Sequence, residues 1–228
     1  IHTHSPRSDL LAYLSNLFLK NKGKRIVTIH GKYGTYLQGN FLIDFLRKIF
    51  IKQQSKIWEK ANKVIVISES IRDWLEKLNS SIKPTVIPYG VEIQEVSQKN
   101  KLANPTLGYL GKLNKNKGIE DLIDVYTKFQ EKENSSNFEL TLLIGGTGSE
   151  NYIKSLKNKI KDNNVKFLGY VEDRYSFFES IEIFVFPSYS EGLGLVLLEA
   201  MAHGVICITR DVTPMNSIVD HEENGFLF

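Results

Sequence analysis

Short runs of apolar, mostly β-branched residues alternate with longer amphipathic stretches along this chain, and that alternation limits the possible folds most. The runs lie at residues 25–30, 63–68, 85–88, 106–111, 139–145, 165–169, 182–188 and 205–209. Between them, apolar residues such as Ile119, Leu122, Ile123 and Tyr126 recur at the spacing of a helix face. Strands that are apolar on both faces and separated by helices predict parallel sheets covered by helices, which is the α/β class.

One polar segment interrupts the alternation and divides the chain. Residues 89–105, "YGVEIQEVSQKNKLANP", show little sustained periodicity. We therefore expect a partial first doubly wound domain at 1–88, a linker at 89–104 and a second doubly wound domain at 105–228. The chain begins at Ile1 in "IHTHS" and ends in "NGFLF"; both segments resemble interrupted strands, so we expect a truncated chain.

Composition excludes several classes of protein. The formal charge of +3 is spread along the chain without a block of like charges, which argues against a nucleic-acid partner. Cys207 is the only cysteine, which fits a reducing compartment, so a cytoplasmic location is expected. No apolar stretch reaches the roughly 18 residues that span a bilayer. Any membrane association is therefore expected to be peripheral.

Polar and glycine residues follow most of the predicted strands. In open α/β sheets, ligands bind at the carboxyl ends of the strands, so these residues are candidates for an active cleft. They are His2, His4, His30 with Gly31, Ser68 with Glu69, Gly111 with Lys112, Gly145 with Gly146, Gly169 with Tyr170, and residues 188–191.

The segment "GKLNKNKG" at 111–118 follows a strand and precedes a predicted helix. Lys112, Lys115 and Lys117 place three positive charges beside a helix N-terminus, where free N–H groups favour anions. A phosphate site and an ordinary solvated loop are both consistent with this pattern. The segment is not a Walker loop, because G-x-x-x-x-G-K-[ST] is absent.

A second glycine-rich segment, "LIGGTGSE" at 143–150, joins a strand to a helix. A dinucleotide fingerprint would require G-x-G-x-x-G, but Asn151 stands where the third glycine belongs. A nicotinamide oxidoreductase is thus disfavoured. We interpret the glycines as forming a tight turn.

The histidines are expected to have different roles. His30 ends a strand and precedes Gly31, so it could bind a hydroxyl group or accept a proton, although a lone histidine at a strand end more often has a structural role. His2 and His4 are expected in one loop, and their spacing without further ligands argues against a metal site. His203 precedes Gly204 at an expected helix C-terminus and is interpreted as a cap residue.

Glu191 and Glu199 lie in "PSYSEGLGLVLLEAMAHG", residues 187–204. The helix is expected to start near residues 193–195 and to end at Gly204. Glu191 then lies at or just before the helix, where an acid stabilises the dipole by a few tenths of a kcal/mol. Glu199 lies deeper, among apolar residues, where a carboxylate is costly to bury. We expect its partner to be the hydroxyl groups of a ligand.

This stretch, a strand followed by Pro-Ser and then E-x7-E, strongly resembles the retaining GT-B glycosyltransferases of the GT4 family, also named glycosyl transferases group 1. Further segments resemble that family in the same order. They are "IHTHS", "VTIHG", "VIVISESI", "VIPYGVE", "LGYLGKLNKNKG", "LLIGGTGSE", "VKFLGYV" and "HEENGFLF". The resemblance implies two Rossmann-like domains facing a cleft.

The resemblance also implies roles for individual residues. Lys112 and Lys117 would hold the diphosphate of a nucleotide-sugar donor, and Glu199 the ribose. Glu191, Gly192 and Leu193 would contact the donor sugar, with the amides of Gly194 and Leu195 available to phosphate. His30 would lie near the reacting sugar, and the main chain of Tyr170 and Val171 near the base.

The implied reaction is the transfer of a sugar, with retention, from a nucleoside diphosphate sugar to a saccharide or lipid-linked acceptor, as in cell-surface polysaccharide biosynthesis. The lysines and helix N–H groups would stabilise the leaving diphosphate, so no metal and no cofactor are required. A cytoplasmic protein, peripheral on the inner face of the plasma membrane, fits such an acceptor. A catalytically silent sugar-nucleotide-binding or scaffold protein of the same fold is the alternative.

Overall fold

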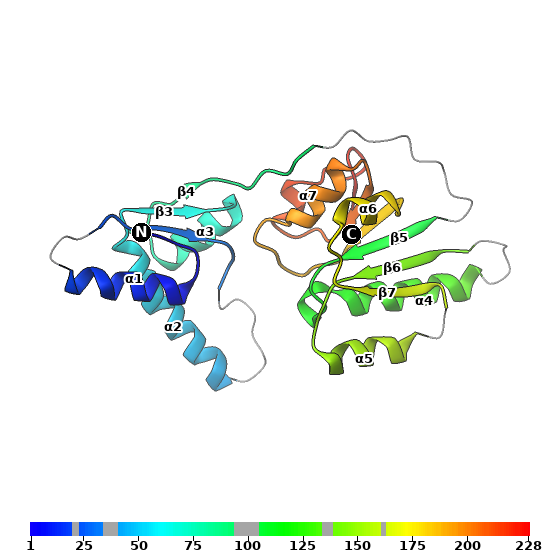
Figure 1. The fold of residues 1–228 in the computed structure, drawn as a ribbon, viewed down its shortest axis with the longest axis horizontal. Helices are drawn as coiled ribbons and strands as arrows, with labels where there is room; N and C mark the ends of the chain where they lie inside the picture. Colours follow the sequence, from blue (N-terminus) through cyan, green and yellow to red (C-terminus); the bar gives the residue numbers. More distant parts are fainter. Residues whose placement is uncertain (20–22, 34–40, 94–104, 134–138, 161–162) are drawn as a thin grey trace. The chain divides into compact units, whose positions relative to one another are not determined.

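The computed structural model describes residues 1–19, 23–33, 41–93, 105–133, 139–160 and 163–228. These residues form two compact units (Figure 1). The first contains residues 1–89 together with 191–193, and the second contains residues 90–190 together with 194–228. Most of the expected linker, residues 94–104, lies outside the described residues.

The first unit is built on a parallel sheet of four strands, in the order β1-β2-β3-β4. The strands are β1 (His2–Thr3), β2 (Ile26–Ile29), β3 (Lys63–Val66) and β4 (Thr85–Val86), and they alternate with the helices α1 (Pro6–Phe18), α2 (Phe41–Glu59) and α3 (Glu69–Leu78). Ser5 and Ser68 cap α1 and α3 by accepting hydrogen bonds from backbone N–H groups in the first turn.

A buried polar contact ties α1 to α2 within this unit. Trp58 is fully buried, and its indole Nε1 donates to Oδ2 of Asp9 at 2.8 Å. Asp9 is itself only 2% exposed, so this hydrogen bond offsets part of the cost of burying its carboxylate. Val27, Ile29 and Val66 pack in the same core.

The second unit contains a parallel sheet of six strands in the order β10-β9-β8-β5-β6-β7. The strands are β5 (Thr106–Leu110), β6 (Thr141–Gly145), β7 (Val165–Gly169), β8 (Ile183–Phe186), β9 (Ile206–Thr209) and β10 (Phe226–Leu227). The helices are α4 (Ile119–Glu133), α5 (Glu150–Lys159), α6 (Arg174–Glu179) and α7 (Leu195–Ala202), with 3-10 turns η1 (Lys115–Lys117) and η2 (Met215–Ser217).

Helices cover both faces of this sheet. In Figure 1, α4 and α5 run along one side of β5, β6 and β7, and α6 and α7 lie on the other. Two hydrophobic cores follow this division, because Ile123 of α4 and Leu156 of α5 share one core while Phe178 of α6 and Leu197 of α7 share the other. The unit is thus doubly wound.

The structure confirms the expected fold class. All eight predicted runs contain a strand, and every strand pairing within the described residues is parallel. One local expectation was wrong: His2 does not lie in the same loop as His4, because His2 pairs with Ile26 as part of strand β1. None of the helices in the described ranges is long and apolar enough to cross a lipid bilayer.

Candidate functional site

The strand order of the second unit defines where its ligand site should lie. Strand β5 pairs with β6 on one side and with β8 on the other, so the chain moves outward through β6 and β7 and then returns to the opposite side of β5. The loops after β5 and β8 therefore leave the sheet in opposite directions, which makes this position a topological switch point. Ligands of open α/β sheets usually bind in the crevice that forms there. The loop after β5 carries the predicted lysines, and the loop after β8 carries Glu191 and leads into the helix that contains Glu199.

The loop after β5 has a defined conformation. Tyr109 donates a hydrogen bond from its hydroxyl to the carbonyl oxygen of Lys112 at 3.1 Å, and Leu113 is buried. Asn114 caps the turn η1, and Gly118 ends it in the left-handed conformation, with φ of 65°. Lys112 is exposed and Lys117 is half-buried, just before the first turn of α4.

The acids in the first turn of α4 are engaged elsewhere. Asp121 accepts hydrogen bonds from Tyr189 and Arg210, and the carboxylate of Glu120 lies 3.5 Å from Nζ of Lys159. These partners offset the negative charges beside Lys117. The local charge therefore suits an anion bound at this turn and helix N-terminus.

The glycine-rich loop after β6 packs against the lysine loop. Leu113 donates from its backbone N–H to the carbonyl of Thr147 at 2.8 Å, and Gly111 donates to Gly145 at 3.0 Å. Gly146 has φ of 137°, and a Cβ there would overlap the carbonyl oxygen of Gly111. The glycines thus serve a close packing of two loops, which agrees with the predicted tight turn.

The glutamate stretch forms the expected helix. Helix α7 begins at Leu195, with Gly194 as its N-cap in the left-handed conformation (φ of 83°). No acid lies in its first turn, so Glu191 does not act as the helix-dipole acid that the sequence suggested. Glu199 lies inside the helix, and His203 ends it, with Nδ1 of its ring 2.7 Å from the carbonyl oxygen of Glu199.

The structure gives Glu199 a partner within the protein, and its contact with ligand hydroxyl groups stays a prediction. Nη1 of Arg174 donates to both carboxylate oxygens of Glu199, at 2.7 and 3.0 Å. The Glu199 side chain is 23% exposed and that of Arg174 is 54% exposed, so the pair lies at the surface. Arg174 begins α6, 25 positions earlier, and no sequence pattern indicated that it would lie beside α7.

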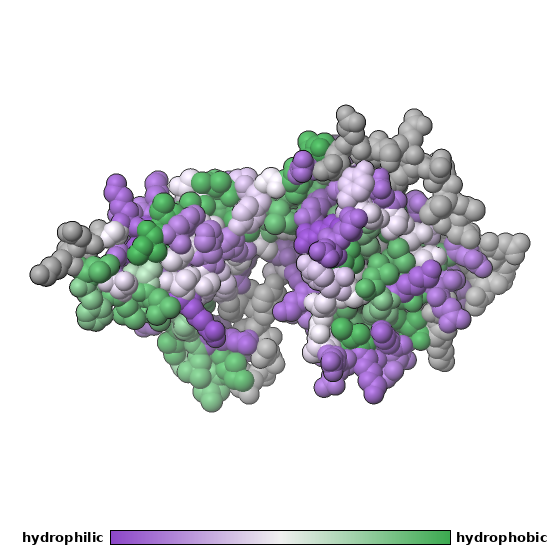
Figure 2. Space-filling model, viewed as in Figure 1, coloured by the Kyte–Doolittle hydropathy of each residue, from purple (hydrophilic) through white to green (hydrophobic). Residues whose placement is uncertain are grey.

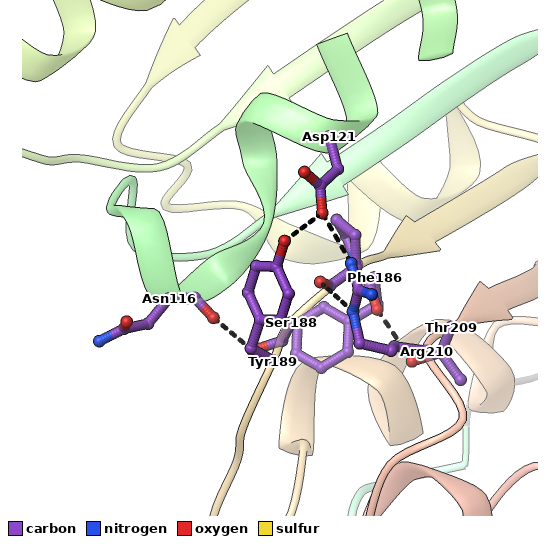
Figure 3. A network of polar contacts seen from close by, with 8 residues as sticks. Asn116, Asp121, Phe186, Ser188, Tyr189, Thr209 and Arg210 are labelled. Carbon is purple, nitrogen blue, oxygen red and sulfur yellow. Dashed lines mark hydrogen bonds and ion pairs between the residues drawn. The ribbon is translucent and has the colours of Figure 1, made fainter. Parts of the chain in front are cut away.

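A polar network connects the loops after β5, β8 and β9 (Figure 3). Oδ2 of Asp121, in the first turn of α4, accepts hydrogen bonds from the Tyr189 hydroxyl at 2.6 Å and from Nη2 of Arg210 at 2.7 Å. The Arg210 guanidinium also lies 4.1 Å from the centroid of the Tyr189 ring. Tyr189 donates from its backbone N–H to the carbonyl of Asn116 at 3.0 Å. The network therefore holds the lysine turn against the segment that leads to Glu191.

Removing the charge of Arg210 tests this network. We expect Arg210→Met to destabilise the protein by about 1–2 kcal/mol, because a charge-assisted hydrogen bond and a cation–π contact are lost together. The measurement is urea unfolding followed by circular dichroism. Arg72→Met is the matched control, since the ion pairs of Arg72 with Glu69 and Asp73 are exposed and contribute little. Equal losses in the two variants would contradict this role.

Tyr170 and Val171 follow β7, as expected for residues that contact a ligand through main chain. Tyr170 is 75% exposed, whereas the side chain of Val171 packs against the core formed by α6 and α7. Their side chains are therefore directed to different environments. A main-chain contact with a base stays a prediction.

The remaining predicted residues group with the first unit. These are His30, which follows β2, and the segment Glu191–Leu193. Within this unit, a Cβ on Gly192 would overlap the carbonyl oxygen of His30, and Ser68 donates from Oγ to the carbonyl of Gly192 at 2.7 Å. Leu193 packs against the core of the first unit. Within the described residues, no three His, Cys, Asp or Glu side chains form a group that could hold a metal.

Two units, each built on a parallel sheet with helices, are the architecture of the GT-B fold. The family model described as "Glycosyl transferases group 1" matches residues 104–228, and that of "Glycosyltransferase Family 4" matches residues 1–95. The chain therefore belongs to the group 1, or GT4, family of glycosyltransferases.

Individual relatives agree with this assignment. The capsular polysaccharide biosynthesis glycosyltransferase CapM of Staphylococcus aureus is 28% identical over the whole of this chain and 62% of its own length. The O-antigen biosynthesis glycosyltransferase WclY of Escherichia coli is 27% identical over 96% of this chain and 63% of its own length. The chain thus spans about three-fifths of these relatives.

Solved structures show the same fold. The structure of HepE from Anabaena in complex with UDP-glucose matches the whole chain with a TM-score of 0.80 at 18% identity, and covers 64% of that protein. Sucrose-phosphate synthase from Thermosynechococcus elongatus matches with a TM-score of 0.82 at 23% identity, and 59% of it is covered.

Proposed function

We propose that this protein transfers a sugar, with retention and without a metal, from a nucleoside diphosphate sugar to a saccharide or lipid-linked acceptor in cell-surface polysaccharide synthesis. The observation that carries the proposal is that two elements follow the adjacent strands β5 and β8 at one topological switch point. They are the turn η1, which carries the lysines, and the helix α7, which contains Glu199. The relatives in capsular polysaccharide and O-antigen biosynthesis support the pathway class, and the complex of HepE with UDP-glucose supports the donor class.

The lysine turn supplies the electrostatics that this reaction needs. When the bond between the anomeric carbon and the phosphate breaks, negative charge develops on the β-phosphate. Lys112, Lys117 and the N–H groups at the start of α4 offer fixed positive charge for that oxygen. The amides of Gly194 and Leu195, at the start of α7, offer further donors. In this proposal these groups stabilise the leaving group without a divalent ion.

Glu191 is assigned an orienting role in the proposal. Retention by double displacement would require a carboxylate to attack the anomeric carbon. We instead assign Glu191, with Gly192 and Leu193, to holding the donor sugar while the acceptor enters on the face of the leaving group. Glu199 binds the ribose hydroxyls, with Arg174 holding its carboxylate in place. Tyr170 and Val171 approach the base through their main chain.

The surface of the first unit supports a lipid-linked acceptor at a membrane. Figure 2 shows apolar residues gathered over α2. Along that helix, Phe41, Leu42, Phe45, Leu46 and Phe50 are each more than half exposed. Lys48 and Lys52 are also exposed on α2, and a helix that combines apolar and basic residues suits the surface of an anionic bilayer. We propose peripheral association with the inner face of the plasma membrane through this helix.

Turnover separates this proposal from a catalytically silent protein of the same fold. We expect the purified protein to release a nucleoside diphosphate from at least one sugar donor in a panel of UDP-, GDP- and ADP-sugars. Lys117→Ala should lower that rate by about 100-fold, as for loss of a transition-state charge contact. The measurement is a coupled assay of released nucleotide.

Lys115→Ala is the matched control, because Lys115 lies in the same turn, is exposed, and has no assigned role. Its rate should stay within about twofold of the parent protein. Binding of a nucleoside diphosphate without turnover of any donor would favour the silent alternative. An equal loss in the two lysine variants would contradict the assignment of Lys117.

A further inference from the structure

Three aromatic side chains of the first unit form a hydrogen-bonded chain at the carboxyl ends of its strands. Nε2 of His30, which follows β2, lies 3.0 Å from Nδ1 of His4, which follows β1. Nδ1 of His30 lies 2.7 Å from the hydroxyl of Tyr89, which follows β4. The rings of His30 and Tyr89 are stacked with an interplanar angle of 12°, and those of His4 and His30 with an angle of 28°.

Both ring nitrogens of His30 are used within this chain. A neutral imidazole has one donor and one acceptor nitrogen, so the hydrogen bonds must all run in the same direction. Either Tyr89 donates to His30 and His30 donates to His4, or His4 donates to His30 and His30 donates to Tyr89. In both arrangements the ring nitrogen at the end of the chain is Nε2 of His4.

The surroundings favour the neutral form of His30. Burial lowers the pKa of His30, and the neighbouring rings of His4 and His2 lower it further, against an opposing effect of Asp9. His4 and His30 cannot both be protonated while they share a hydrogen bond, because two N–H groups would then face each other. His30 is half-buried, whereas His4 and Tyr89, at the two ends of the chain, are both exposed. Nε2 of His4 is the ring nitrogen at these ends that the chain itself does not use, so we assign the ligand contact to it.

His2 further restricts the His4 ring. Nε2 of His2 is hydrogen-bonded to Oγ1 of Thr28 at 2.8 Å, and the centroids of the His2 and His4 rings are 4.3 Å apart. His4 thus lies between a ring held by β2 on one side and His30 on the other. A ring held in this way presents Nε2 in a fixed direction, which is the requirement for binding one particular hydroxyl group.

We propose that Nε2 of His4 hydrogen-bonds the acceptor hydroxyl group that takes the sugar, and that His30 and Tyr89 are positioning residues that hold the His4 ring. This inference rests on the proposed function, in which the first unit binds the acceptor. A hydroxyl group can donate or accept, so it matches either direction of the chain.

Substitutions at His4 separate the roles of its two nitrogens. Glutamine places a polar atom near the position of Nε2, and asparagine places one near that of Nδ1, while phenylalanine keeps the ring and removes both. We expect His4→Phe and His4→Asn to lower kcat for nucleotide release about tenfold, with the KM for the donor sugar unchanged. His4→Gln should recover at least half of the rate. Tyr89→Phe should give a smaller loss of the same kind.

Tyr13→Phe is the control, because Tyr13 is a tyrosine of the same unit whose hydroxyl accepts a hydrogen bond from Lys60. Equal rates for His4→Gln and His4→Asn, or unchanged rates in His4→Phe, would overturn the proposal.

Nitrogen-15 spectra of histidine-labelled protein test the hydrogen-bonded chain without any donor sugar. They should show a single fixed tautomer of His30 that is lost in Tyr89→Phe. Averaged tautomers of His30 in the parent protein would overturn the proposal for His4. Absence of turnover with every donor would count against the proposed function instead, so the two failures can be told apart.

Discussion

Replacing Glu199 by alanine is expected to weaken nucleoside diphosphate binding by about 100-fold. In the proposed site, its carboxylate accepts hydrogen bonds from two ribose hydroxyls. Hydrogen bonds to a charged group contribute roughly 1.5–3 kcal/mol each, so the loss of two costs at least about 3 kcal/mol, which lowers the affinity by at least about 100-fold. The measurement is isothermal titration calorimetry with the best-binding nucleotide from a panel of UDP, GDP and ADP.

The same substitution should have little effect on the fold. The pair of Glu199 with Arg174 is partly exposed, and such pairs contribute about 0–1 kcal/mol to stability. Arg174→Gln should weaken nucleotide binding less than Glu199→Ala does, because the carboxylate remains and loses only its orientation. Glu150→Ala, at the start of α5, is the control for removing one acid from the second unit. Affinity within twofold of the parent protein for Glu199→Ala would exclude the assigned ribose contact.

Replacing Gly146 by alanine is expected to destabilise the protein by more than about 3 kcal/mol. The residue has φ of 137°, which L side chains rarely adopt, and its new Cβ would overlap the carbonyl oxygen of Gly111. Neither loop can move away easily, because Leu113 and Gly111 donate backbone hydrogen bonds to Thr147 and Gly145. For a chain of this size, we expect Tm to fall by about 10 °C.

Gly23→Ala is the matched control for this effect. Nothing lies within 4 Å of a Cβ at Gly23, and its φ is outside the left-handed region. Its Tm should therefore stay within about 2 °C of the parent value. Differential scanning calorimetry measures both variants. If Gly146→Ala unfolds at the same temperature as Gly23→Ala, the two loops do not pack as closely as the structure indicates.

The strands and the glutamate helix could be predicted because their signals are local. A buried parallel strand is a short apolar run, and α7 is bounded by Gly194 and Gly204, so neither depends on distant residues. The use of the second glycine-rich segment as a tight turn followed from a missing third glycine. These features explain why the fold class was confirmed.

The contacts that complete the site could not be predicted, because they join distant positions. Asp121 and Arg210 are 89 positions apart, and each lies in an ordinary polar loop or helix start. The chain of His4, His30 and Tyr89 depends on the register of β1 against β2 and on the place of β4 in the sheet. The contact of Glu199 with Arg174 was not indicated by the sequence for the same reason, since Arg174 reaches it from another helix.

In the proposed function, a nucleoside diphosphate binds in the second unit at the lysine turn and the start of α7. Amide hydrogen–deuterium exchange with and without the best-binding nucleotide tests it most directly. We predict slower exchange at residues 115–119 and 195–199 when nucleotide is present, and unchanged exchange in α5. Protection confined to other segments, or slower exchange with NADH but with none of the nucleoside diphosphates, would contradict the account.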